Sequence, residues 1–316
     1  QVSLEDFELQ DQQAWARILN SLFDACARRT PGVACIKVSQ ETGIGAEPGS
    51  NRSTLEIISD DFPFLVDSFK MVLDGLGISC YAIVHPVLTV SRDASGQLDG
   101  IPGPISESVV WMEIERQTGE GADALIEAVR RTLEDVRVSV EDWRQMREKM
   151  LEVAQTVSQQ RIERCEIDPL EAREFLQWAA ENHFTFLGFR EYRQLEVVPG
   201  TGLGLLRDEH HSARARPVKS LGRKQINRHE LLILTKTAAR STVHRSTYMD
   251  YIGVLRYDAD GNAVGEYRFI GLLTTSAYNR RPWEIPVVRQ KYEKVMQASG
   301  LSLEGHSGKA LRQILE

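Results

Sequence analysis

The sequence predicts an α+β protein with two mainly antiparallel sheets that are joined by a long helix. Three observations support this class. Residues 33–150 alternate as strand, strand, helix, strand, strand, helix, and residues 184–273 contain strand-like runs that follow a single helix. Residues 121–160 repeat apolar side chains at steps of three and four, the pattern of a helix long enough to leave one domain and reach another. The 316 residues suffice for about two domains of ~150 residues each.

The composition is that of an ordinary soluble globular chain. Hydrophobic residues make up 42% and charged residues 26%, so there is enough apolar material for real cores. The net charge of −7 argues against a chain built to bind nucleic acid, and there is no run of 18 apolar residues that would predict a membrane span. The acidic, mixed start is unlike a signal peptide. We therefore expect a cytoplasmic protein without nucleic-acid or membrane partners. Its four cysteines are expected to be reduced and buried: Cys26, Cys35, Cys80 and Cys165.

The first elements in chain order are a helix over residues 11–28 and a strand over 33–38. Apolar side chains share one face of this helix, and Thr30-Pro31-Gly32 ends it. Residues 40–53 form a loop that is rich in glycine. A buried strand is expected over residues 55–58, because its apolar run is rich in β-branched residues.

The next stretch predicts a polar turn and the start of a second helix. Ser59, Asp60 and Asp61 offer N-cap oxygens, and Pro63 suits the first helical turn, where its missing N–H is not needed. Gly75 and Gly77 would end the helix. A strand–turn–helix of this kind presents backbone N–H groups and a positive dipole end to anything bound there.

A long strand over residues 78–90 is expected to return as a strand over 108–115, after a turn region at 92–104. The long helix follows. Residues 33–150 would then close as a split βαβ unit, with two helices on one face of a mainly antiparallel sheet.

The second half begins with a helix that is capped by Asp168-Pro169. Strands are expected over residues 184–192, 231–235, 251–257 and 265–273, with a hairpin turn at Asp258-Ala259-Asp260-Gly261. A closing helix after Pro286 ends at Gly300, and Ser307 is the expected N-cap of a last amphipathic helix.

These signals divide the chain into five parts. We predict an N-terminal helical segment (1–32), a first domain (33–150), a helical linker (151–168), an α+β domain (169–280) and a C-terminal helical segment (281–316). The chain begins without Met and ends inside the last amphipathic helix. We therefore expect it to be a fragment that leads to further domains.

The sequence contains only weak signals for a catalytic, cofactor-binding or metal-binding motif. Gly200-Thr201-Gly202-Leu203-Gly204-Leu205 has Leu205 where a dinucleotide fingerprint needs its third glycine, which favours a hairpin loop. His210-His211 has no partner at metal-ligand spacing, so a solvated loop is expected instead of a metal site. No G-x-S-x-G motif is present.

Three groups of charged residues leave alternatives open. Asp60-Asp61 could hold a cation or act in acid–base chemistry, or could cap a helix at the surface. The basic segment 207–228 could dock on an acidic surface or remain a solvated loop. Residues 240–245 alternate cationic and small residues like a strand with one polar face. If this face coincides with the polar faces of two neighbouring strands, the cations could form a patch that binds a carboxylate or phosphate. The alternative is that these cations pair with acids across the strands. The patch would comprise Arg240, His244, Arg245, Arg256 and Arg268.

Several blocks together resemble the N-terminal region of the large bacterial NAD-dependent glutamate dehydrogenases. The resemblance runs in order from about residue 15 to the end. Its blocks are 62–68 (FPFLVDS), 85–87 (HPV), 107–108 (ES), 183–192 (HFTFLGFREY), 241–245 (STVHR), 248–252 (YMDYI), 274–279 (TTSAYN) and 308–311 (GKAL).

The resemblance implies that the parent enzyme deaminates L-glutamate oxidatively to 2-oxoglutarate with NAD, in amino-acid catabolism. It implies an ACT-like, ferredoxin-like module at 33–150 and a PAS-like antiparallel module at 169–280, with roles in assembly and allosteric control. The family's catalytic lysines and dinucleotide site have no counterpart here, so no catalytic residue, metal or cofactor is expected in this fragment. An ACT module is usually βαββαβ, but no strand follows the long helix; residues 33–38 could supply the fourth strand instead.

Three hypotheses follow. In the first, a small effector such as an amino acid binds the strand–helix turn at Asp60, Asp61, Phe62, Phe64 and Ser68, and its carboxylate lies near the helix N-terminus. In the second, the fragment is an oligomerisation scaffold without a ligand site, whose partners are other domains of the same chain and further copies of it. The third is an independent enzyme that uses Asp60, Asp61 or His244.

Overall fold

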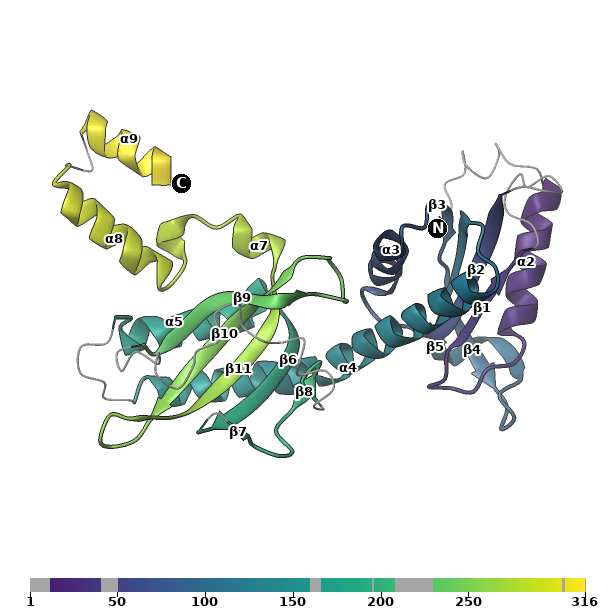
Figure 1. Cartoon of the computed structure of the whole chain (residues 1–316), viewed down its shortest axis with the longest axis horizontal. Helices are drawn as coiled ribbons and strands as arrows, with labels where there is room; N and C mark the ends of the chain where they lie inside the picture. Colours follow the sequence, from purple (N-terminus) through teal and green to yellow (C-terminus); the bar gives the residue numbers. More distant parts are fainter. Residues whose placement is uncertain are drawn as a thin grey trace. The chain divides into compact units, whose positions relative to one another are not determined.

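The computed structural model describes residues 12–40, 51–159, 166–194, 196–207, 230–302 and 305–315 (Figure 1). The chain forms two compact units: unit 1 comprises Gln1–Arg137 with Thr242–Ser246, and unit 2 comprises Val138–Ser241 with Thr247–Glu316. The long helix α4 (Glu120–Val157) is therefore shared by the two units. None of the described helices is both long enough and apolar enough to cross a membrane.

Unit 1 is built on a five-stranded antiparallel sheet in the order β1-β2-β5-β3, with β4 also paired to β5. Its sheet is formed from β1 (Cys35–Ser39), β2 (Arg52–Asp60), β3 (Cys80–Val84), β4 (Val87–Arg92) and β5 (Leu98–Glu115). The edge position beside β2 is filled by β1, although no strand follows α4 among the described residues of unit 1. The prediction that residues 33–38 supply the fourth strand of a split βαβ unit is thereby confirmed.

The predicted long strand over residues 78–90 is divided at His85-Pro86 into β3 and β4. Val84 pairs with Trp111 and Val87 with Ser108, so the register along β5 is the same on both sides of the division. Pro86 has no N–H to donate, but its carbonyl accepts from the Val109 N–H at 3.0 Å. β5 starts ten residues earlier than predicted, at Leu98 rather than 108, so the expected turn region at 92–104 was too long.

The sheet of unit 1 is covered on both faces, whereas the sequence predicted helices on one face. Figure 1 shows α3 (Leu65–Leu76) and α4 on one side of the sheet and α2 (Gln12–Cys26) on the other. α2 packs Trp15, Ile18 and Leu22 against Ile58 and Trp111 of the sheet. Because both faces are buried, β5 is apolar at consecutive positions instead of alternate ones.

The predicted N-cap of α3 is wrong. Ser59 and Asp60 are the last residues of β2, and the helix starts at Leu65 after Phe64. Phe64 has a left-handed backbone with φ 73°, and no side chain caps the helix. Gly77 ends the helix in the left-handed conformation with φ 70°, as predicted, while Gly75 lies inside the helix.

Unit 2 is built on a six-stranded antiparallel sheet in the order β7-β6-β11-β10-β9, with β8 paired to β6. Its strands are β6 (Phe184–Arg193), β7 (Glu196–Val197), β8 (Leu203–Gly204), β9 (Leu232–Arg240), β10 (Tyr248–Tyr257) and β11 (Ala263–Leu273). The core packs Met150 of α4 and Phe175 of α5 (Pro169–Trp178) against Ile252 and Phe269 of the sheet. Helices α4 and α5 lie behind the sheet in the view of Figure 1.

Local signals in unit 2 are mostly confirmed. Asp168 caps α5, its carboxylate accepting from the Leu170 N–H at 2.7 Å, and Gly261 has φ 75° in the β10–β11 hairpin. Short α7 (Thr275–Tyr278) and η3 (Pro282–Glu284) lead to α8 (Val288–Ser299), which ends at Gly300 as predicted. The last helix, α9 (His306–Leu315), begins before Ser307, so Ser307 is not its N-cap.

Candidate functional site

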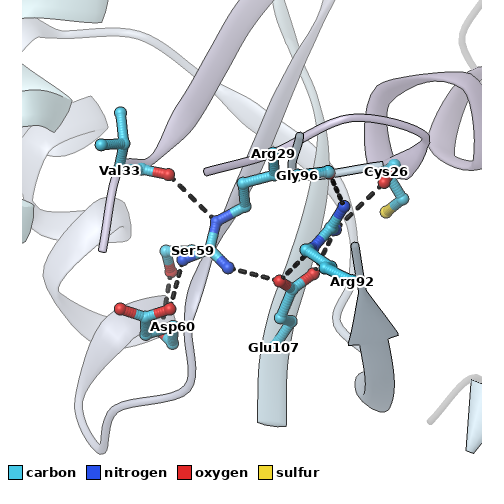
Figure 2. Close-up of polar contacts among 8 residues, drawn as sticks. All are labelled: Cys26, Arg29, Val33, Ser59, Asp60, Arg92, Gly96 and Glu107. Carbon is cyan, nitrogen blue, oxygen red and sulfur yellow. Dashed lines mark hydrogen bonds and ion pairs between the residues drawn. The ribbon is translucent and has the colours of Figure 1, made fainter. Parts of the chain in front are cut away.

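A buried cluster of charges holds the end of β2, next to the turn predicted to bind an effector (Figure 2). The Glu107 carboxylate on β5 accepts from two arginines. Arg92 binds it through Nε at 2.7 Å and Nη2 at 2.6 Å, and Arg29 donates to both Glu107 and Asp60. The side chains of Arg29, Arg92 and Glu107 are each only 1% exposed. Such bidentate, charge-assisted contacts fix the geometry of the cluster.

The same two arginines tie neighbouring backbone to the cluster. Arg29 Nε donates to the Val33 carbonyl at 3.0 Å, and Arg92 donates to the carbonyls of Cys26 and Gly96 at 3.0 and 2.9 Å. The end of α2, the β4–β5 turn, the end of β2 and the middle of β5 are therefore held together. Two positive and two negative side chains balance, so the cluster acts as a closed structural clamp.

The protonation of the clamp follows from its contacts. Burial alone would raise the pKa of the Glu107 carboxyl, but the hydrogen bonds and charges of Arg92 and Arg29 outweigh it and hold that pKa below its ordinary value. The Glu107 carboxylate correspondingly raises the pKa of Arg92. The Asp60 carboxylate, which the sequence offered as an acid–base or effector group, is already paired with Arg29.

The turn that follows is contacted by the segment Thr242–Ser246 of unit 1. The rings of Phe64 and His244 lie 4.7 Å apart. Ser68 is fully buried; its hydroxyl donates to the Phe64 carbonyl at 2.6 Å and accepts from the His244 N–H at 3.0 Å. His244 Nδ1 lies 3.5 Å from the exposed Asp67 carboxylate. Thus two predicted effector residues meet a residue of the predicted anion patch.

The segment is not the strand that alternation over residues 240–245 suggested. It contains bends instead of extended backbone, and His244 has φ 68°. The Thr242 hydroxyl donates to Asp135 of α4 at 2.6 Å, which gives the segment a second attachment. Asp61 is exposed and Phe62 half-buried, so these two residues of the turn remain accessible.

The arginines of the predicted anion patch do not share one face. In the β10–β11 ladder Arg256 is opposite Gly265 and Arg268 is opposite Gly253, which places the two arginines on opposite faces of the sheet. Arg268 donates to Glu266 at 3.1 Å and to the Tyr251 hydroxyl at 2.9 Å. Arg256 pairs with Glu191, and Arg240 lies over the Tyr248 ring at 5.1 Å. Arg256 pairs across strands with an acid, as the alternative interpretation expected, whereas Arg268 pairs within its own strand and Arg240 contacts an aromatic ring.

Comparison with known proteins identifies the family of the chain. The family model described as "Glutamate dehydrogenase, ACT1 domain" matches residues 1–132, and "Glutamate dehydrogenase, helical motif 1" matches residues 285–316. An NAD-specific glutamate dehydrogenase of Halomonas elongata is 34% identical over 289 residues, which cover 84% of this chain and 18% of that protein. The chain belongs to the large NAD-specific glutamate dehydrogenase family.

Further relatives agree with this assignment. The NAD-specific glutamate dehydrogenase of Pseudomonas aeruginosa is 33% identical over 291 residues, with coverage of 84% of this chain and 18% of that protein. That of Mycobacterium tuberculosis is 26% identical over 303 residues, which cover 91% of this chain and 18% of that protein. The chain thus spans about a fifth of the length of these relatives.

Within residues 1–132, which match the ACT1 domain model, sequence reasoning missed Arg29, Arg92 and Glu107. One signal was available: Glu107 and Glu113 stand in the apolar strand β5, and a charged residue in a buried strand needs a partner. Glu113 is bound by Arg52 at 2.5 Å, but burial still raises its pKa. Which arginine meets which acid depends on long-range pairing that no local pattern encodes.

The remaining sequence predictions concern loops and thiols. The Gly200–Leu205 stretch leads into β8, where the Gly204 N–H donates to Asp142 at 2.7 Å, so it opens no helix. Arg207 pairs with Asp142 at 2.9 Å, while residues 208–228, His210-His211 and Cys165 lie outside the described residues. Cys26 is buried and free; Cys35 and Cys80 are free and half-buried. The described residues contain no cluster of three or more His, Cys, Asp or Glu that could hold a metal.

Proposed function

We propose that this chain is a regulatory and assembly region of an NAD-specific glutamate dehydrogenase. The match of residues 1–132 to the ACT1 domain carries the proposal. In this proposal the whole enzyme converts L-glutamate, NAD and water to 2-oxoglutarate, ammonium and NADH in the cytoplasm, and other domains of the long chain supply the catalytic residues and the NAD site. Further copies of the chain are its assembly partners.

Each unit has a part in the proposal. Unit 1 supplies the ACT-like module, supported by its split βαβ sheet. Unit 2 supplies a PAS-like sensor module, supported by an antiparallel sheet with α4 and α5 on one face. An amino-acid effector binds at the β2–α3 turn, with its carboxylate near the start of α3 and with Asp61, Phe62 and Phe64 around it. Asp60 and Ser68 shape this turn from inside, through Arg29 and the Phe64 carbonyl.

The contact of His244 with the turn makes the effector proposal testable. An effector must replace the ring contact of His244 with Phe64, so removal of the His244 ring should strengthen effector binding. Isothermal titration calorimetry of the 316-residue protein against each common amino acid should give heat for at least one of them. His244→Ala should bind that amino acid more tightly, and His306→Ala, an exposed histidine on α9, should bind it as the wild type does. No heat for any amino acid in any of the three proteins would exclude the effector.

A second candidate is a scaffold without an effector site at the turn. The observation that favours it is that the turn is already contacted by the chain's own segment Thr242–Ser246. Analytical ultracentrifugation with and without amino acids distinguishes the two. Self-association that does not change with amino acids, together with silent calorimetry, would favour the scaffold.

A further inference from the structure

We infer that unit 2 carries a ligand site of its own, a pocket for a small hydrophobic carboxylate. This site is independent of the β2–α3 turn. The pocket has a volume of about 650 Å³ and lies where α5, the β9–β10 pair, α7 and the start of α8 meet. Pockets for small molecules typically have volumes of ~300–1,000 Å³ and mostly apolar walls.

The walls of the pocket are apolar and partly exposed to solvent. Leu234 is 41% exposed, Tyr278 60% and Val288 36%, and all three line the same hollow together with Trp178. Single exposed apolar side chains are common on protein surfaces, but a group of them around one concavity marks a place where apolar surface is covered by a ligand.

The charges at the pocket favour an anion. Lys236 is directly opposite Asp250 across β9 and β10, and the two side chains pair at 2.7 Å. The other carboxylate oxygen of Asp250 accepts from the Leu273 N–H at 2.9 Å, so both oxygens of this acid are engaged. A lysine ammonium has three N–H donors, so Lys236 keeps donors for a further acceptor.

Arg280 adds a second cation to the lining of the pocket. Its guanidinium has no hydrogen-bond or ion-pair partner among the residues that the structure describes, and it is exposed. The pocket is therefore lined by two cations, Lys236 and Arg280, and by one acid, Asp250, whose two oxygens are already engaged. A ligand with one carboxylate and an apolar body matches both the charge and the walls: the carboxylate binds Lys236 and Arg280, and the body covers Leu234, Tyr278 and Val288.

Aromatic or branched 2-oxo acids, the corresponding amino acids and short fatty acids share this chemistry. Isothermal titration calorimetry of the 316-residue protein with phenylpyruvate, phenylalanine and octanoate identifies which of these three classes of carboxylate binds. Phenethylamine, which has the apolar body but no carboxylate, is the negative probe. We expect saturable binding of at least one of the three carboxylates and none of phenethylamine.

Variants test whether the binding uses this pocket. Lys236→Met and Arg280→Met should each weaken it about tenfold, the value of one charge-assisted hydrogen bond. Lys294→Met, an exposed lysine of α8 outside the lining, and His244→Ala at the turn should bind as the wild type does. Thermal melting checks that each variant is folded. Binding that both pocket substitutions leave unchanged, or no binding of any carboxylate, would overturn the inference. Tighter binding in His244→Ala, with both pocket substitutions without effect, would assign the ligand to the turn instead.

Discussion

The two regions that could bind a ligand differ in what already occupies them. At the β2–α3 turn of unit 1, Asp60 is paired with Arg29, Ser68 is buried, and the His244 ring contacts the Phe64 ring. At the pocket of unit 2, apolar side chains remain exposed around a hollow of about 650 Å³. The turn carries the motifs that attract notice in the sequence, yet two of its polar side chains, Asp60 and Ser68, are used by the fold.

This difference shows that residue type alone does not identify a site. A carboxylate or a helix N-terminus is available to a ligand only where no side chain of the protein already binds it. The Glu107 clamp stabilises unit 1 with charges that are matched inside the protein, whereas Lys236 and Arg280 keep donors at the surface of unit 2. We therefore expect substitutions at the clamp to affect stability and substitutions at the pocket to affect binding.

The largest effect is expected at the clamp. Glu107→Ala would leave Arg29 and Arg92 buried without their shared acid, which should lower the free energy of unfolding by about 3–5 kcal/mol. Urea denaturation measures the loss. Arg130→Ala is the control, because its pair with Glu127 is exposed and should change stability little. A loss below about 1 kcal/mol for Glu107→Ala would contradict the role of the clamp.

The pH dependence of stability should have opposite signs at two acids of β5. The folded pKa of Glu107 lies below the ordinary 4.5, so its stabilisation is present above pH 4.5 and is lost as the pH falls through the folded value. Burial raises the folded pKa of Glu113 above the ordinary 4.5, although the charge of Arg52 acts in the opposite direction. Ionisation of Glu113 therefore costs stability as the pH rises through the folded pKa.

Substitutions at these acids test the signs. Glu113→Gln should raise the free energy of unfolding at pH 7, and this gain should vanish below pH 4.5, the ordinary pKa of a glutamate. Glu107→Gln should lower it at pH 7, with a loss that shrinks in acid. Unfolding curves recorded between about pH 3.5 and 7.5 measure both. The same sign for the two variants at pH 7 would contradict the assignment.

A smaller effect is expected where His244 contacts the turn. His244→Ala removes the ring contact with Phe64, which should cost about 1 kcal/mol. His244 has φ 68°, which glycine adopts more easily than alanine, so His244→Gly should be less destabilised than His244→Ala by about 0.5–1 kcal/mol. Hydrogen exchange of the α3 amides reports this stability locally. Equal protection in the two variants would show that the left-handed backbone contributes nothing.

The smallest effect is expected at the pocket. Lys236→Met breaks an ion pair whose lysine is 43% exposed, so the free energy of unfolding should change by no more than about 0.5 kcal/mol. Thermal melting beside the wild type measures it, and Lys294→Met is the matched surface control. A loss comparable to that of Glu107→Ala would show that Lys236 has a structural role.

Much of the fold could be predicted because its signals are local. Asp168-Pro169 caps a helix through its own side chain and ring, and Gly77, Gly261 and Gly300 stop elements by adopting positive φ. The edge position of residues 33–38 followed from counting the strands that a split βαβ unit needs.

The rest depends on contacts between residues that are far apart in the sequence. Phe64 is held at positive φ, which few non-glycine residues adopt and no sequence pattern announces. Arg29, Arg92 and Glu107 meet only after three elements have packed. The faces of Arg256 and Arg268 depend on the register of the β10–β11 ladder, which alternation within one strand cannot give.

Hydrogen–deuterium exchange with mass spectrometry tests most directly whether these carboxylates bind at the pocket of unit 2 and not at the β2–α3 turn. The 316-residue protein is compared with and without saturating amounts of whichever of phenylpyruvate, phenylalanine or octanoate binds. We predict slower exchange in β9, in residues 248–252 and in residues 274–280, with no change in residues 60–68. Slower exchange confined to residues 60–68 would contradict this prediction and place the ligand at the turn.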